Sequence, residues 1–170
     1  MAPQVSVPSQ IRQALAAQLQ TAREVALLAV GSELRGDDAV ALRIAELVQE
    51  SREQSQRLSV FIGATAPENC TGPIRRLNPS HLLVIDAADL GAAPGSLALL
   101  QMRDLAGVTF CTHVLPLSVI LEYIVRSCPD CQVVVLGVQP DRLDFAAPLT
   151  PAVEDAAQQI ADMIRCALAN

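Results

Sequence analysis

Four acidic or imidazole side chains follow three of the apolar runs that this sequence contains. Asp37 and Asp38 come in the loop after one run, Asp86 ends another, and His113 lies in the loop after a later one. The carboxyl ends of parallel strands share one edge of a sheet, where α/β proteins bind ligands, so we expect Asp38, Asp86 and His113 to meet there. Two carboxylates and one imidazole suit a divalent metal such as zinc or nickel. Three protein ligands leave coordination positions open for catalysis, because the metal could then polarise a carbonyl or activate water.

Each of these residues also has a simpler interpretation. Asp37 is a natural N-cap for the helix predicted after it. Asp86 could end a strand and accept hydrogen bonds from the next loop, and a lone His113 fits a structural histidine. These interpretations stay open at this point, and it is the coincidence of three such side chains at one edge that favours a site.

The elements that must position these side chains alternate between strands and helices. Apolar runs predict five strands, over residues 24–30, 58–63, 81–86, 97–102 and 132–138. Helical spacing of apolar residues predicts helices over about 10–22, 38–51 and 115–127. We expect Ser9 to cap the first helix and Thr150 to cap a closing helix that has Pro151 at its first position. The segment 65–79 is expected to be a loop with at most one short helical turn. This alternation predicts a three-layer α/β fold, with a mostly parallel five-stranded sheet covered by helices on both faces.

Composition limits the functions that this chain could have. Its 170 residues suit one domain over residues 1–170, and 51% of them are apolar. The net charge is −6 and the chain has no Lys, so it lacks the basic surface of a nucleic-acid binder. No apolar run approaches the roughly 20 residues that a membrane-spanning helix needs. We therefore expect no nucleic acid, no membrane insertion and a cytoplasmic location.

The five cysteines stand at irregular spacing, which is typical of reduced thiols. Cys128 and Cys131 form a lone CxxC. A redox pair or half of a zinc site is possible, but a structural zinc site needs a second ligand pair at suitable spacing. The simpler interpretation is two thiols in a turn before a strand.

Five motifs occur in order along the chain: GSELRGDD at 31–38, TAPEN at 65–69, LLVIDAADLG at 82–91, CTHVLPL at 111–117 and LGVQPD at 136–141. Together they resemble the nickel–iron hydrogenase maturation endopeptidases, most closely the type that serves hydrogenase 3. The resemblance covers about residues 25–166. It implies a twisted five-stranded sheet and an enzyme that removes the C-terminal extension of the hydrogenase large-subunit precursor after nickel insertion.

The resemblance also implies roles for individual residues. Asp38, Asp86 and His113 match the family's metal contacts, and Asp37 would be the helix-capping neighbour of the first. The enzyme would be a metal-dependent, aspartic-type endopeptidase with Asp38 as the candidate catalytic residue. The nickel would be supplied by the precursor, and zinc or another divalent ion could occupy the isolated site. Ser32 and Ala41 stand where family members usually carry Asn and Gly, which puts the loop geometry in question but removes no ligand.

The same motifs indicate how the chain divides into an extension and a core, and which other functions have to be considered. Residues 1–23 are interpreted as an N-terminal extension with an added helix, and residues 24–168 as the peptidase core. One alternative is a non-catalytic metal-sensing chaperone or check-point protein of the same fold. A phospho-acceptor receiver domain is another, but that fold normally uses a Lys near its site, and this chain has none. The oligomeric state is left open.

Overall fold

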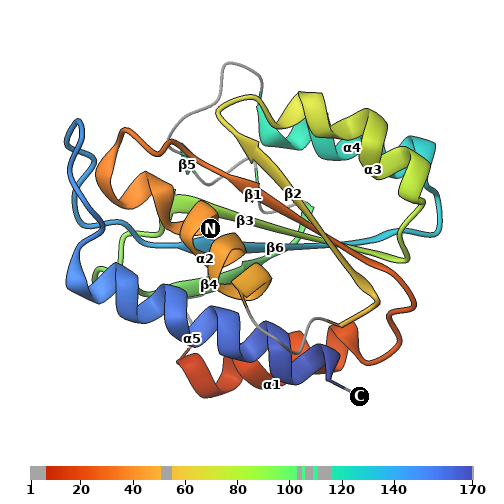
Figure 1. Ribbon diagram of the computed structural model, residues 1–170, viewed down its shortest axis with the longest axis horizontal. Helices are drawn as coiled ribbons and strands as arrows, with labels where there is room; N and C mark the ends of the chain where they lie inside the picture. The colour runs from red at the N-terminus through yellow and green to blue at the C-terminus, as the bar shows by residue number, and fades with distance from the viewer. Residues whose placement is uncertain (1–6, 51–54, 103–104, 106–108, 111–115, 170) are drawn as a thin grey trace.

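A computed structural model describes residues 7–50, 55–102, 105, 109–110 and 116–169 (Figure 1). The strands are β1 (Val25–Val30), β2 (Leu58–Ala64), β3 (His81–Asp89), β4 (Leu97–Leu100), β5 (Thr109–Phe110) and β6 (Gln132–Val138). The α-helices are α1 (Pro8–Leu19), α2 (Val40–Glu50), α3 (Thr71–Leu77), α4 (Leu117–Ser127) and α5 (Pro151–Leu168). Two 3-10 turns, η1 (Gly36–Ala39) and η2 (Pro67–Cys70), lead into α2 and α3.

The strands form one sheet in the order β2-β1-β3-β6-β4. β1 pairs in parallel with β2 and β3, and β3 pairs in parallel with β6. β4 runs antiparallel to β6 at the edge of the sheet. The mostly parallel sheet is therefore confirmed, and all five predicted strands are present. The two-residue β5, which pairs with the end of β3, was not predicted, because so short a strand has no recognisable pattern.

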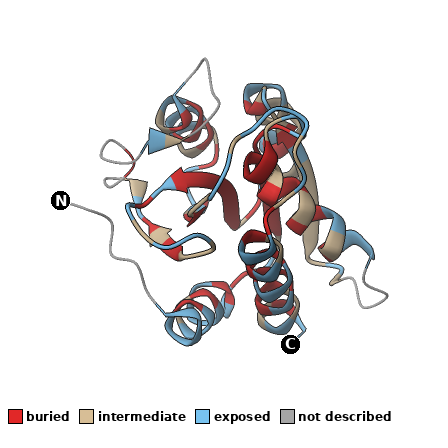
Figure 2. Cartoon of the chain, turned by 90° about the vertical axis from the view of Figure 1, so that its left-hand side faces the viewer, coloured by how far each residue is buried: buried red, intermediate tan, exposed pale blue. Residues whose placement is uncertain are grey.

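Helices cover both faces of the sheet (Figures 1 and 2). Alternate residues of β1 point to opposite faces, so Leu27 packs with α1, α2 and α5 while Leu28 packs with α3 and α4. Every residue of β1 is buried. This burial on both faces explains why the strand reads as a continuous apolar run rather than an alternating one.

The N-terminal helix α1 packs directly on the core. Its buried face consists of Ile11, Leu15 and Leu19, which join the apolar cluster that α2 and α5 also form. The expected cap was wrong: the N-cap position is Val7, it makes no side-chain capping bond, and Pro8 opens the helix. Proline suits this position because the first helical N–H groups have no partner within the helix.

Two other predictions from the sequence need correction. Residues 65–79, expected to be mainly loop, contain both η2 and α3. The third strand was expected to end at Asp86, but β3 continues to Asp89. In the described part of the chain, no helix combines the length and the apolar character that crossing a bilayer would require.

Candidate active site

Asp38 lies in η1, the turn that follows β1, and its side chain is completely buried. The turn approaches the end of β1 so closely that a Cβ on Gly31 would lie 1.9 Å from the carbonyl oxygen of Asp38. Gly31 also has φ +144°, a conformation that L side chains rarely adopt. Glycine at this position is therefore required to bring Asp38 back over the end of its own strand.

Asp86 lies inside β3 and is also completely buried. In the sheet it pairs with Gly137 of β6, while the preceding Ile85 pairs with Ala29 near the end of β1. The η1 turn packs against β3. Asp38 thus follows β1, Asp86 lies in the neighbouring parallel strand β3, and both are toward the carboxyl ends of these strands.

Carboxylates can be buried only where hydrogen bonds, opposite charges or a metal offset the loss of hydration. The buried Oδ1 atoms of Asp38 and Asp86 accept no hydrogen bond from the described residues, although both residues have other interactions. Oxygen donors of this kind are ligands for a divalent cation. No group of three His, Cys, Asp or Glu among the described residues is placed to hold a metal. His113, the third predicted ligand, lies outside those residues.

Asp37 does not cap the helix that follows it, which corrects the prediction. Its buried carboxylate accepts four hydrogen bonds from a segment distant in the chain. Oδ2 accepts from the backbone N–H of Asp141 at 2.9 Å and of Arg142 at 3.0 Å. The backbone N–H of Thr150 donates to Oδ1 at 2.6 Å, and its hydroxyl donates to Oδ2 at 2.9 Å. Asp37 therefore fixes the loop between β6 and α5 to the loop that carries Asp38.

Backbone contacts reinforce this connection. The N–H of Asp37 donates to the carbonyl of Arg142 at 2.9 Å. A Cβ on Gly36, which has φ +52°, would lie 2.7 Å from that same carbonyl oxygen. We refer to Asp37, Thr150 and the backbone of 141–142 as the Asp37 clamp. The sequence did not predict this role of Asp37, because the donors to its carboxylate are mainly backbone N–H groups, which almost every residue type carries.

Thr150 occupies the N-cap position of α5 with Pro151 at the first helical position, as predicted. Its hydroxyl, however, makes no capping bond and donates to Asp37 instead. The backbone carbonyl of Thr150 accepts from the N–H groups of Val153 and Glu154. The start of α5 is thus tied to the turn that holds Asp38.

Gln139 connects the loops that follow β3 and β6. Its Oε1 accepts from the backbone N–H of Leu90 at 2.6 Å and of Ala92 at 3.3 Å. Its Nε2 donates to the carbonyl of Pro140 at 3.2 Å. The glutamine of the LGVQPD motif is therefore a structural link at the edge of the sheet that carries Asp86.

Ser32, one of the two departures from the family pattern, shapes the same edge. Its Oγ accepts from the backbone N–H of Leu34 at 3.3 Å, which closes a turn formed by a serine side chain. Ala41, the second departure, is completely buried in α2. Both departures from the family pattern, Ser32 and Ala41, are therefore residues with small side chains.

The CxxC pair lies in a turn before β6, as the simpler interpretation predicted. Cys128 and Cys131 are both buried free thiols, and the N–H of Cys131 donates to the carbonyl of Cys128 at 3.0 Å. Burial, with a smaller contribution from Cys128, raises the pKa of Cys131 to about 11. Metal binding and redox exchange need the thiolate, so this environment does not favour either.

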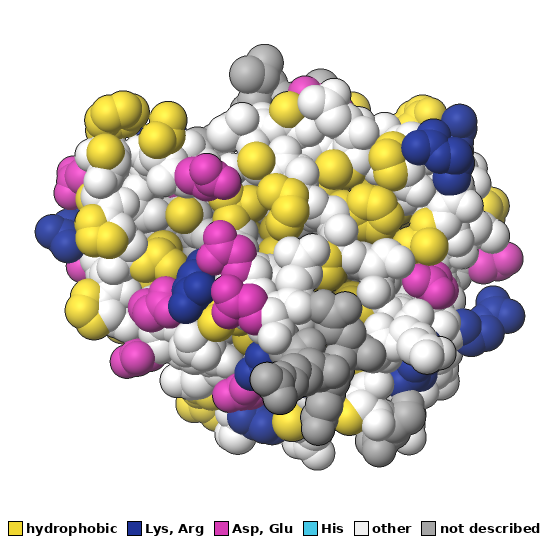
Figure 3. Space-filling model, in the orientation of Figure 1, with side chains coloured by type: hydrophobic (Ala, Val, Ile, Leu, Met, Phe, Trp, Pro, Cys, Tyr) yellow, Lys and Arg dark blue, Asp and Glu magenta, His cyan; other side chains and the backbone are white. Residues whose placement is uncertain are grey.

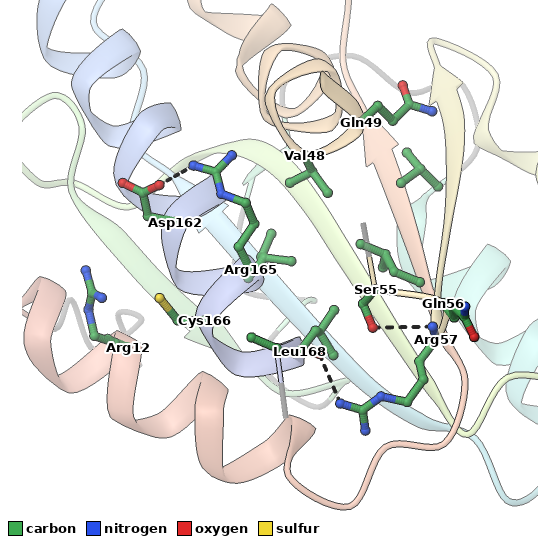
Figure 4. Close-up of a pocket in the computed structure, with 14 residues that line it drawn as sticks. Arg12, Val48, Gln49, Ser55, Gln56, Arg57, Asp162, Arg165, Cys166 and Leu168 are labelled. Atoms are coloured by element: carbon green, nitrogen blue, oxygen red, sulfur yellow. Dashed lines mark hydrogen bonds and ion pairs between the residues drawn. The ribbon is translucent and has the colours of Figure 1, made fainter. Parts of the chain in front are cut away.

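A cavity of about 1130 Å³ lies at the opposite end of the strands from Asp38, near the first residues of β2 and the last turn of α5 (Figure 4). Two of the arginines that line it have structural partners. Arg57 donates to the carbonyls of Ala22 and Leu168, and Arg165 donates to the carbonyl of Leu47 and pairs with Asp162. These guanidinium groups fasten α2, α5 and the connection from α1 to β1, so we do not assign the cavity as the active site.

His81, the second histidine of the chain, stands at the start of β3. His81 therefore lies toward the opposite end of the strands from the Asp38 turn, as expected from the sequence. The ring is buried, and burial lowers its pKa. His81 is therefore separated from the two buried carboxylates by most of the length of a strand.

A family model described as hydrogenase maturation protease (HycI) matches residues 42–167. The hydrogenase 3 maturation protease of Escherichia coli K12 is 33% identical over 135 residues, covering 79% of this chain and 84% of that protein. A putative hydrogenase maturation protease of Methanocaldococcus jannaschii is 27% identical over 150 residues, covering 85% of this chain and 88% of that protein.

Solved structures agree with these matches. The HycI hydrogenase maturation protease of Thermococcus kodakarensis superposes with a TM-score of 0.84 over 92% of this chain and 99% of that one, and its 23% identity shows the fold alone. The solution structure of the endopeptidase HycI of Escherichia coli gives a TM-score of 0.73 at 32% identity, covering 82% of this chain and 87% of that one. The extent of the family match and the identity to the Escherichia coli protease together decide the assignment: this chain belongs to the hydrogenase maturation protease family.

Proposed function

We propose that this protein is an endopeptidase that removes the C-terminal extension of a nickel–iron hydrogenase large-subunit precursor after nickel has been inserted. The observation that supports it is the burial of two carboxylates, Asp38 in the turn after β1 and Asp86 in the neighbouring parallel strand β3, toward the same end of the strands. Burying both groups costs hydration, so a site that receives a cation would explain the arrangement. Family membership supplies the reaction.

In this proposal Asp38, Asp86 and His113 bind the nickel that the precursor already carries. The metal is part of the substrate, and zinc or another divalent ion could occupy the same residues in the isolated enzyme. Carboxylate oxygen and imidazole nitrogen suit such ions. Because the enzyme would bind the precursor through its nickel, cleavage would depend on a completed metal centre. A precursor without nickel has no metal for these residues to bind.

The same contact would place the scissile bond beside Asp38. A carboxylate there can accept the proton of an attacking water. The bound metal would supply charge to polarise the scissile carbonyl or to activate that water. Asp37 and Gly31 contribute by fixing the turn, since a base that is misplaced by about 1 Å can lose roughly 100-fold in rate.

The first experiment is cleavage of the cognate precursor with and without nickel, followed by mass spectrometry of the products. We expect a C-terminal peptide to be released from the nickel-loaded precursor alone. Cleavage of both forms would leave a protease but remove nickel as the signal. Metal binding without any cleavage would instead support the non-catalytic check-point protein.

Single substitutions then test the residues. Asp38→Asn, Asp86→Asn and His113→Ala should each reduce cleavage by on the order of 100-fold or more. Each should also weaken the binding of nickel or zinc to the protein without precursor, which is a readout independent of turnover. The matched control is Asp89→Asn, because Asp89 is exposed at the end of β3, the strand that carries Asp86, and its carboxylate accepts a hydrogen bond from the N–H of Gly91. Nickel-dependent cleavage at the wild-type rate by His113→Ala would remove His113 from the site.

A further inference from the structure

Two large apolar side chains are exposed on two adjoining loops, one before the turn that carries Asp38 and one between β6 and α5. Phe145 is 79% exposed and Leu34 is 57% exposed. Their loops are joined by a backbone bridge between Arg35 and Phe145 and by a hydrogen bond of 2.9 Å from the N–H of Ala146 to the carbonyl of Leu34. We call Leu34 and Phe145 the apolar tip. In Figure 3 hydrophobic side chains gather at the upper left end of the molecule, where Figure 1 shows the loop between β6 and α5.

The apolar tip is held outward by the backbone rather than by packing. The Asp37 clamp fixes one side of the loop, at the N–H groups of 141 and 142. On the other side, Ala146 has φ +55°, a left-handed conformation that is unfavourable for a non-glycine residue. A strained residue persists only where surrounding contacts impose its conformation, and such residues concentrate at functional sites. Here the contacts that impose this conformation, among them the hydrogen bond from the N–H of Ala146 to Leu34, also hold the loop that exposes Phe145.

An exposed phenyl ring on a fixed loop adds little to the hydrophobic core. It is well suited to binding, because aromatic anchors dominate interface energies and an anchor that is already ordered loses little entropy on association. Tyr123 and Val119, which are also exposed, lie together on α4 rather than on the loops of the site. The apolar tip differs from them because it lies on the two loops that the Asp37 clamp joins beside Asp38.

We propose that the apolar tip docks into an apolar pocket on the surface of the folded hydrogenase precursor and so sets the position of the scissile segment. This inference rests on the proposed function. The occupant follows from position: the loops that present Leu34 and Phe145 adjoin the turn that carries Asp38, so a protein substrate bound at Asp38 comes within reach of them. Docking would supply affinity at a distance from the reacting bond, and so its loss should be seen in KM rather than in kcat.

The test uses steady-state cleavage of the nickel-loaded precursor by Phe145→Ala, Leu34→Ala and the double variant. Truncating an anchor of this kind should raise KM about 10- to 30-fold and leave kcat within about twofold of wild type. The matched control is Tyr123→Ala, which removes a 47% exposed aromatic ring from α4 and should leave both constants unchanged. Thermal unfolding of each variant checks that the fold is intact.

The outcomes separate this inference from the proposed function. If the wild-type protein cleaves the precursor and Phe145→Ala has an unchanged KM, docking by the apolar tip is wrong while the protease assignment stands. If Phe145→Ala converts a wild-type dimer to a monomer without changing KM, the tip binds a second copy of this chain and the inference is again wrong. If the wild-type protein cleaves nothing, the proposed function fails. Direct binding of the precursor then decides: weaker binding by Phe145→Ala supports docking, and equal or absent binding overturns it.

Discussion

Asp37 and Thr150 are 113 positions apart in the chain, yet two hydrogen bonds join them, one from the N–H and one from the hydroxyl of Thr150. All four donors to the Asp37 carboxylate come from the connection between β6 and the start of α5. The two acidic residues of the first loop therefore differ in their contacts. Asp37 holds the loop in place, and the chemical role proposed above belongs to its neighbour Asp38.

The two neighbours should respond in opposite ways to the same substitution. Asp37→Asn replaces an acceptor oxygen with an NH2 group that faces donors, so we expect a loss of about 2–4 kcal/mol in the free energy of unfolding. Asp38→Asn should change stability less, because a neutral amide is easier to bury than a carboxylate, and it should abolish cleavage. Urea denaturation and precursor cleavage measure the two effects. Equal loss of stability in both variants would contradict this difference.

Removing only the hydroxyl donor of the clamp gives a finer test. Thr150→Val keeps the shape and the backbone N–H of residue 150 but leaves Oδ2 of Asp37 with fewer donors. We expect the free energy of unfolding to fall by about 1–2 kcal/mol, the cost of breaking a hydrogen bond to a buried charged group. Thr150→Ser retains the hydroxyl and should stay closer to wild type. If the two variants have the same denaturation midpoint, this hydroxyl contributes nothing to stability.

Gly31→Ala should displace the turn that carries Asp38. The added Cβ would lie 1.9 Å from the carbonyl oxygen of Asp38, a backbone atom that cannot rotate away, so we expect at least a 100-fold loss of cleavage if the protein folds. The control is Gly72→Ala in α3, where the nearest atom is the Arg76 guanidinium at 3.6 Å. That change should be neutral or stabilise the helix by about 0.5–1 kcal/mol. Wild-type cleavage by Gly31→Ala would show that the turn relaxes without moving Asp38.

His81 predicts a pH dependence of stability. Burial lowers the pKa of its ring in the folded state, so the unfolded chain takes up a proton first as the pH falls. The contribution to stability is present above the unfolded pKa of about 6.5 and is lost as the pH drops below it. We expect the free energy of unfolding to fall more steeply between about pH 7 and pH 5 in wild type than in His81→Gln. Parallel profiles for the two proteins would contradict this assignment.

The sequence predicted the sheet and the place of Asp38 and Asp86, because both follow from simple physics. Strands buried on both faces must be apolar throughout, and side chains beyond their carboxyl ends collect at one edge. The Asp37 clamp could not be predicted, since its partners are mainly backbone N–H groups brought close only by the complete fold. Helix α3 was missed because Gly72 and Pro73 in its first turn resemble a loop. The contribution of His113 stays a prediction.

The tie that Arg57 makes between the carbonyls of Ala22 and Leu168 has a practical consequence. It places the last turn of α5 at the end of the sheet remote from the two buried carboxylates, and Cys166 is an exposed thiol in that turn. A maleimide coupled there would tether the protein to a sensor surface with the end that carries Asp38 and Asp86 facing outward. A precursor as large as a folded hydrogenase subunit could then approach without obstruction from the support.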